Sequence, residues 1–279
     1  MKASKIFVFA ALLSVTILAG ACILSTAEPE SPVESPKEPI EEPEERIDTL
    51  NHILWFNPGK HAFSKLDVFL YDNNLKLHRV IYEQDSLHIT LEKDTEYTVV
   101  AVANIRGEFN DTALQHYDAW DAFEISLTTE NPEHPIMGAT GKISANTEGQ
   151  SEIELTSLIC TIEIRSVTQL LSDDTLIENP RVHLTNRSTK SRLLSRENIA
   201  PSEQEDSETI FLPSDIGVYT QYPGVKLYSY PNEVASTASS PATEIVLEYE
   251  INGTTKQYKQ TVHPLQRGCW EMIDIEIRQ

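Results

Sequence analysis

Short segments in which apolar and polar residues alternate follow one another from Leu50 to the end of the chain, with turn residues between them. A period of two is typical of half-buried β-strands. The pattern predicts strands over Leu50–Phe56, Leu66–Tyr71, Leu75–Tyr82, Ser86–Leu91, Tyr97–Asn104, Phe123–Leu127, Ile136–Ser144, Glu152–Val167, Arg181–Asn186, Val225–Tyr230, Thr243–Ile251, Thr254–Val262 and Cys269–Ile277. Helical turns are expected only within Thr112–Asp121 and Val167–Leu171. The chain is therefore expected to be an all-β protein.

Two of these segments carry further information. Asn252-Gly253 separates two alternating runs, and this dipeptide is typical of a tight β-hairpin. Tyr97–Ala103 is apolar at both parities, which favours a central strand that is covered on both faces.

The run Ser151–Val167 is longer than an ordinary strand. We expect it to leave one sheet and enter another, which places a domain boundary near Thr156–Leu158. Two antiparallel β-sandwich domains in tandem follow from this division.

The N-terminus has the pattern of an export signal. Lys2 and Lys5 precede an apolar run, Ile6 to Leu18, which is too short to cross a bilayer. Leu18-Ala19-Gly20-Ala21-Cys22 resembles the lipobox of bacterial lipoproteins, whose cysteine is acylated, although Ala19-Gly20-Ala21 also suits the ordinary signal peptidase. We expect lipidation at Cys22.

An acidic segment follows the cysteine. Residues 28–45 contain eight Glu and five Pro and have no aromatic residue, so the segment is expected to be extended and disordered. This gives a signal peptide (1–21), a lipidated tether (22–47), an N-terminal β-sandwich (48–157) and a C-terminal β-sandwich (158–279). The alternative is a secreted protein with a disordered leader.

Composition narrows the function classes. The formal net charge of −21 disfavours nucleic acid as a partner. Hydrophobic residues make up 40% of the chain, which is enough to form folded hydrophobic cores. No catalytic motif is present, and the eight histidines show no metal-ligand spacing. We therefore expect neither an enzyme nor a cofactor nor a metal.

The segment around residues 117–124 offers two weak candidate sites. Its carboxylates Asp118, Asp121 and Glu124 could meet a Ca²⁺ ion, but they lack the EF-hand pattern. Tyr117, Trp120 and Phe123 could stack on a sugar, although packing beneath a loop is favoured.

Cys160 and Cys269 remain as a pair, and both lie at inward positions of their expected strands. A disulfide between them and two buried free thiols are both compatible with the sequence.

The block Leu66–Asn104 resembles the fimbrillin-like and fimbrial-anchor lipoproteins of Bacteroidetes, the subunits of type V pili. Its strand, polar hairpin and closing Leu91–Asn104 segment carry the resemblance, together with His134–Gly138, Leu155–Val167 and Arg267–Ile277. The resemblance implies paired transthyretin-like sandwiches and assembly with fimbrial subunits by strand addition. It also implies attachment to the outer membrane at the cell surface.

Stalk subunits of that family are implied to lose an N-terminal strand after cleavage at an arginine. Cleavage at Arg46 would release only the tether, and Arg79 lies inside an expected strand. Leu50–Phe56 is therefore expected to stay in place, which favours an anchor or accessory subunit. The alternative function is a glycan-binding lipoprotein of a polysaccharide-uptake system. A carbohydrate partner is possible but not favoured, because the chain has only three Trp.

Four Asp-Thr/Ser segments resemble the O-glycosylation acceptor of exported Bacteroidetes proteins. Such tripeptides also arise by chance in an Asp-rich chain. The candidate acceptors are Thr49, Ser86, Thr112 and Thr175.

Overall fold

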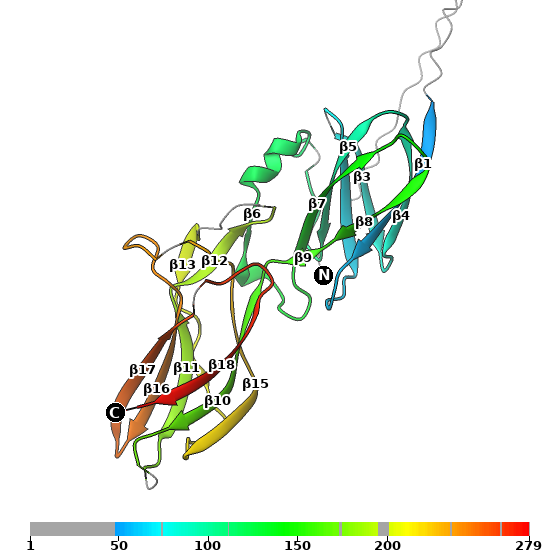
Figure 1. Cartoon of the computed structure of the whole chain (residues 1–279). Coiled ribbons are helices and arrows are strands. Elements are labelled where there is room, and N and C mark those ends of the chain that lie inside the picture. Colours follow the sequence, from blue (N-terminus) through cyan, green and yellow to red (C-terminus); the bar gives the residue numbers. More distant parts are fainter. Residues whose placement is uncertain are drawn as a thin grey trace, which may run out of the picture. The chain divides into compact units, whose positions relative to one another are not determined.

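A computed structural model of the chain describes residues 48–73, 75–110, 112–172, 175–194, 201–234, 236–262 and 264–278. The predicted signal peptide, Cys22, the predicted acidic tether and Arg46 lie outside these ranges. The regular secondary structure of the described part consists of β-strands in several sheets, with two short 3₁₀ helices (Figure 1). The predicted all-β sandwich fold is confirmed.

The strands of the first half form two sheets. One has the order β4-β1-β8, from β1 (Thr49–Asn57), β4 (Ser86–Glu92) and β8 (Gly149–Glu154). The other has the order β3-β2-β5-β7-β9. Its members are β2 (Lys65–Tyr71), β3 (Leu75–Tyr82), β5 (Glu96–Ala103), β7 (Met137–Ser144) and β9 (Thr156–Ser157). Inward side chains of both sheets share one apolar core, which includes Leu54 and Phe56 of β1 and Val99 and Ala101 of β5.

The strands of the second half form a second pair of sheets. One has the order β15-β10-β18, from β10 (Cys160–Gln169), β15 (Tyr219–Ser229) and β18 (Trp270–Ile277). The other has the order β14-β11-β16-β17. Its members are β11 (Glu178–Thr185), β14 (Ile210–Phe211), β16 (Glu244–Ile251) and β17 (Thr254–Thr261). A separate core lies between them, with Ile162 and Ile164 facing Leu184 and Leu247.

A small fifth sheet joins strands from both halves. Its order is β13-β12-β6, from β6 (Glu124–Ser126), β12 (Arg187–Arg192) and β13 (Glu203–Glu205). The pattern predicted β6 but neither of its partners, because the sequence of β12 (RSTKSR) is polar. Three of its polar residues are buried nonetheless, at Ser188, Thr189 and Ser191.

The central position predicted for Tyr97–Ala103 is confirmed. β5 lies between β2 and β7, and Val99 and Val100 are both fully buried although they point to opposite faces. The inner face belongs to the sandwich core. The outer face is covered by the segment between β5 and β7, which contains η1 (Tyr117–Ala122) and η2 (Leu127–Thr129).

The long run Ser151–Val167 changes sheets as predicted. It is divided among β8, β9 and β10, which belong to three different sheets. The domain division at residues 157 and 158 stays a prediction, because Leu158 and Ile159 pack in a third core together with Phe69 and Val100.

Two strand pairs are parallel, β1 with β8 and β10 with β18. The sequence analysis expects antiparallel sheets, and these two pairs depart from that expectation, because a half-buried strand has the same pattern whichever way its neighbour runs. None of the described residues forms a helix long and apolar enough to cross a bilayer.

Candidate assembly site and the adjoining cavity

The first strand occupies the middle of its sheet. β1 pairs antiparallel with β4 from Thr49 to Trp55, and parallel with β8 from His52 to Asn57. Figure 1 shows this sheet at one side of the first sandwich. Removing a strand from this position leaves an open slot between two neighbours, and that slot is the geometry that accepts a strand from another chain.

Side chains hold β1 in this slot. Leu54 and Phe56 are 0% and 2% exposed and lie in the sandwich core. Truncating residues of this kind to alanine costs about 2–5 kcal/mol each. β1 is therefore an integral part of the described fold.

A buried histidine adds a polar contact between β1 and β8. Nε2 of His52 lies 3.0 Å from Oγ of Ser151, and its Nδ1 atom is buried without a hydrogen-bond partner among the described residues. Burial lowers the pKa of His52, because the charged imidazolium loses water around it. The contact between His52 and Ser151 thus adds to the apolar packing that holds β1 beside β8.

Several strands end their sheets and leave one backbone edge without a ladder partner among the described residues. These strands are β3, β4, β6, β8, β9, β13, β14, β15, β17 and β18. β18 also carries exposed apolar side chains, with Trp270 and Met272 exposed by 40% and 61%. Unpaired edges of this kind are sites for adding a further strand.

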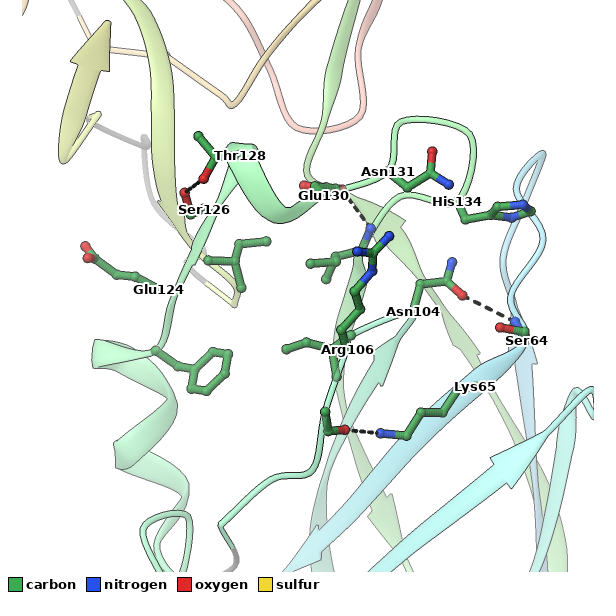
Figure 2. A pocket seen from close by; sticks show the side chains of 15 residues that line it. Ser64, Lys65, Asn104, Arg106, Glu124, Ser126, Thr128, Glu130, Asn131 and His134 are labelled. Atoms are coloured by element: carbon green, nitrogen blue, oxygen red, sulfur yellow. Dashed lines mark hydrogen bonds between the residues drawn. The ribbon is translucent and has the colours of Figure 1, made fainter. Parts of the chain in front are cut away.

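A large cavity lies beside β6 (Figure 2). Its volume is about 950 Å³. It is bounded by β6 with Phe123, by the start of β2, by residues 104–107 after β5, and by the loop from Thr128 to Ile136. A smaller recess of about 210 Å³ shares Ile105, Arg106 and Phe123 with the cavity and continues toward Phe109 and Leu114.

Most polar groups of the cavity wall are already engaged. Asn104 Nδ2 donates to the carbonyl oxygens of Ala62 and Pro135, and Nζ of Lys65 lies 2.7 Å from the carbonyl oxygen of Gly107. Arg106 differs, because no hydrogen bond or ion pair joins its guanidinium to any residue that the structure describes. Figure 2 shows its side chain extending across the cavity in the direction of Glu130.

Glu130 lies at the back of the cavity and links the two halves. Its Oε1 atom accepts the backbone N–H of Ile136 at 2.7 Å, and its Oε2 atom accepts the hydroxyl of Tyr230. Burial raises the pKa of Glu130 to about 7, against the opposing effect of these two hydrogen bonds. Nothing in the sequence distinguishes Glu130 from the other glutamates, because glutamates are common throughout this chain.

The aromatic residues of η1 pack inward. Trp120 is 1% exposed and donates its indole N–H to the hydroxyl of Tyr71 at 2.9 Å. Its ring contacts Phe69, Phe109 and Phe123. The packing interpretation of Tyr117, Trp120 and Phe123 is thus the one the structure supports.

Asp118, Asp121 and Glu124 do not form a metal site. The described residues contain no group of three or more His, Cys, Asp or Glu side chains that could hold a metal ion.

Cys160 begins β10 and Cys269 directly precedes the neighbouring strand β18, and both are free thiols. Contact with the thiol of Cys269, together with burial, raises the pKa of Cys160, whereas the same contact lowers the pKa of Cys269. The structure brings the two residues together, and the disulfide between them stays a prediction.

The four candidate glycosylation acceptors are placed differently. Thr49 and Thr112 are exposed, and Ser86 is half-buried at the start of β4. Thr175 is also half-buried, with its Oγ1 atom 2.6 Å from Oγ of Ser172.

Arg79, the next arginine after Arg46, lies in β3 as expected. Its backbone is paired to Val68, while its side chain is exposed.

Comparison with known proteins gives a family and a fold. Residues 57–266 match the family model described as fimbrillin-A associated anchor proteins Mfa1 and Mfa2. A comparison with curated protein sequences finds no match.

Solved structures share the fold at low sequence identity. A candidate cell adhesion protein of Parabacteroides distasonis has 13% identity and a TM-score of 0.63, over 82% of this chain and 88% of that one. One from Bacteroides eggerthii has 13% identity and a TM-score of 0.61, over 82% and 85%. A fimbrilin of Porphyromonas gingivalis has 12% identity and a TM-score of 0.56, over 77% and 82%.

Proposed function

Because the chain belongs to the family of fimbrillin-A associated anchor proteins Mfa1 and Mfa2, we propose that it is a fimbrial anchor or accessory subunit held at the outer membrane by a lipid. Family membership supports a pilus-related adhesion role at the cell surface. In this proposal the protein is not an enzyme, and its partners are other fimbrial subunits.

The lipid anchor rests on the N-terminal sequence. Cys22 follows a short apolar run and small residues, and the acidic segment 28–45 begins six residues later. Several acyl chains on one cysteine bind a membrane durably, since each buried CH₂ contributes about 0.8 kcal/mol. An extended, self-repelling tether then keeps the sandwiches away from the membrane surface.

The position of β1 supports an anchor or accessory subunit over a stalk subunit. β1 lies between β4 and β8 and contributes Leu54 and Phe56 to the core. Arg46 precedes β1, so cleavage there leaves the strand in the fold. A subunit that keeps its first strand has no open slot at this position, so it joins its partners through other strand edges or by donating a strand.

The lipid is tested by membrane fractionation and by the mass of the mature N-terminal peptide. We expect acyl mass on Cys22 and recovery of the protein in the outer-membrane fraction. The variant Cys22→Ser should move to the soluble periplasmic or secreted fraction. An unmodified Cys22 in the mature protein contradicts the lipoprotein proposal.

The retention of β1 is tested with an arginine-specific protease on intact cells, with untreated cells as the control. We expect cleavage to leave residues 50–56 in the folded protein and fimbrial subunits to co-purify with it. Loss of β1 together with growth of a polymer of this chain would instead identify a stalk subunit.

A further inference from the structure

We propose that the cavity beside β6 receives an extended segment of a fimbrial subunit, with a carboxylate side chain on Arg106 and a neighbouring apolar side chain in the recess at Phe109 and Phe123. This inference rests on the proposed function and specifies where and how such a partner binds. Three independent features of the cavity support it.

The first feature is the charge of the cavity. The other cation of the wall, Lys65, is occupied by the carbonyl oxygen of Gly107 and by the carboxylate of Asp67 at 3.0 Å. Both carboxylate oxygens of Glu130 are occupied as well. The Arg106 guanidinium therefore has no partner among the described residues in a chain of strongly negative charge. A guanidinium binds a carboxylate through two parallel hydrogen bonds, so the complementary ligand group is an acid.

The second feature is the smaller recess. Its walls include Ile105, Phe109, Ala113, Leu114 and Phe123, and its volume is about 210 Å³. This size suits a single large apolar side chain. Because the recess shares Arg106 with the cavity, an acidic group and an apolar group of one ligand can occupy both at once. A sugar acid has the carboxylate but lacks the apolar group.

The third feature is the place of β6 at the end of its sheet. β6 is the last strand in the order β13-β12-β6, and its pairing with β12 joins Glu124–Ser126 to Lys190–Arg192. The same three residues line the cavity. An extended peptide in the cavity therefore lies along an edge strand, where backbone hydrogen bonds can add to the side-chain contacts. Together the three features favour a polypeptide strand.

The test places a photo-cross-linking amino acid at His134, whose exposed side chain lies at the mouth of the cavity (Figure 2). The full chain is expressed in cells that also make the fimbrial subunits, and the cross-linked peptide is identified by mass spectrometry. The same amino acid at Leu170, an exposed position after the end of β10, gives the background.

We expect a cross-link to a fimbrial subunit, within a segment that contains Asp or Glu beside a large apolar residue. Arg106→Gln should reduce this cross-link about tenfold, because a charge-assisted contact is lost. Ala113→Trp, which fills the recess, should reduce it similarly. The matched control Arg79→Gln removes an exposed arginine elsewhere in the same half and should leave the yield unchanged.

Several results would overturn the inference. These are an undiminished cross-link in Arg106→Gln, a cross-linked segment without an acidic residue, an adduct with a glycan, and no cross-link above the Leu170 background. Co-purification of fimbrial subunits separates the two levels of the proposal. When one of these results is obtained but fimbrial subunits still co-purify with the chain, only the cavity assignment is wrong. When no fimbrial subunit associates with the chain, the proposed function is wrong too.

Discussion

At the scale of single residues, some contacts join parts of the chain that lie far apart in the sequence. Glu130 and Tyr230 lie 100 positions apart and share a hydrogen bond. The N–H of Thr161, next to Cys160, donates to the carbonyl oxygen of Cys269, although 109 positions separate the two cysteines in the sequence. Both pairs have pKa values shifted by burial and by their partners, so both yield predictions that depend on pH or on thiol chemistry.

Glu130 should make stability fall as the pH rises. Its pKa in the folded protein is about 7, above the ordinary 4.5, so the folded state binds the proton more tightly than the unfolded state. This stabilisation is fully present below pH 4.5 and is lost as the pH rises through about 7. Its size is on the order of 3 kcal/mol.

Urea denaturation of the wild type and of Glu130→Gln at several pH values measures this effect. We expect the difference in the free energy of unfolding between the two proteins to change with pH over the range from about 4.5 to about 7. Tyr230→Phe, which keeps the carboxyl group, serves as the control. A difference that is independent of pH contradicts the raised pKa.

The two thiols should differ in reactivity in the native protein. The pKa of Cys160 is raised and that of Cys269 is lowered, so Cys269 supplies the reactive thiolate. We expect a maleimide to modify Cys269 first and Cys160 only after denaturation. Prior modification of Cys160 would show that the order is wrong.

A thiol count in the denatured mature protein tests the disulfide between Cys160 and Cys269. The absence of free thiols would show that the disulfide forms, and such a bond stabilises a fold by about 2–4 kcal/mol.

At the scale of elements, a strand's contribution depends on which of its side chains reach the core. On β1, Phe56 is 2% exposed and Trp55 is 42% exposed, although they are neighbours in the sequence. On β17, six of the eight positions are exposed, so this strand is held by its hairpin with β16.

Phe56→Ala should destabilise the protein by about 3–5 kcal/mol, because it leaves a cavity in the first sandwich. Trp55→Ala on the same strand should cost less than about 1 kcal/mol, since the indole lies at the surface. Thermal and urea denaturation compare the two. Equal losses would mean that β1 contributes little to the core.

The β16–β17 hairpin should be sensitive to a side chain at Gly253. Asn252 and Gly253 have φ values of 52° and 74°, and they form the two-residue turn that the sequence predicts. Gly253→Ala should cost about 1 kcal/mol, because L-residues are strained in this conformation. Gly217→Ala is the matched control, since a Cβ there meets no atom within 4 Å and its φ is not positive. The prediction is wrong if both variants are equally stable.

At the scale of the whole molecule, the two halves share structure across the predicted boundary. β6 pairs with β12, and Leu158, Ile159, Leu193 and Tyr230 pack in the third core beside residues of β2 and β5. The halves have their own sandwich cores, yet the outer face of one sheet is completed by the other half.

A fragment of residues 48–157 should therefore be less stable than the chain 48–279 and should bind an apolar dye at its uncovered face. Circular dichroism and dye fluorescence measure both properties. The fragment 158–279 offers a comparison, because most of its core lies within that half. A fragment 48–157 as stable as the longer chain would support two independent domains.

The sequence by itself determined most strand positions, the central place of Tyr97–Ala103 and the Asn252-Gly253 hairpin. These features depend on local residue patterns, because alternation and turn preferences act over a few neighbouring residues. The tertiary structure alone decided the parallel pairing of β1 with β8, the burial of the polar β12, and the cavity with Arg106 and Glu130. Partners, strand direction and desolvation are set by segments far apart in the chain, and no local pattern contains them.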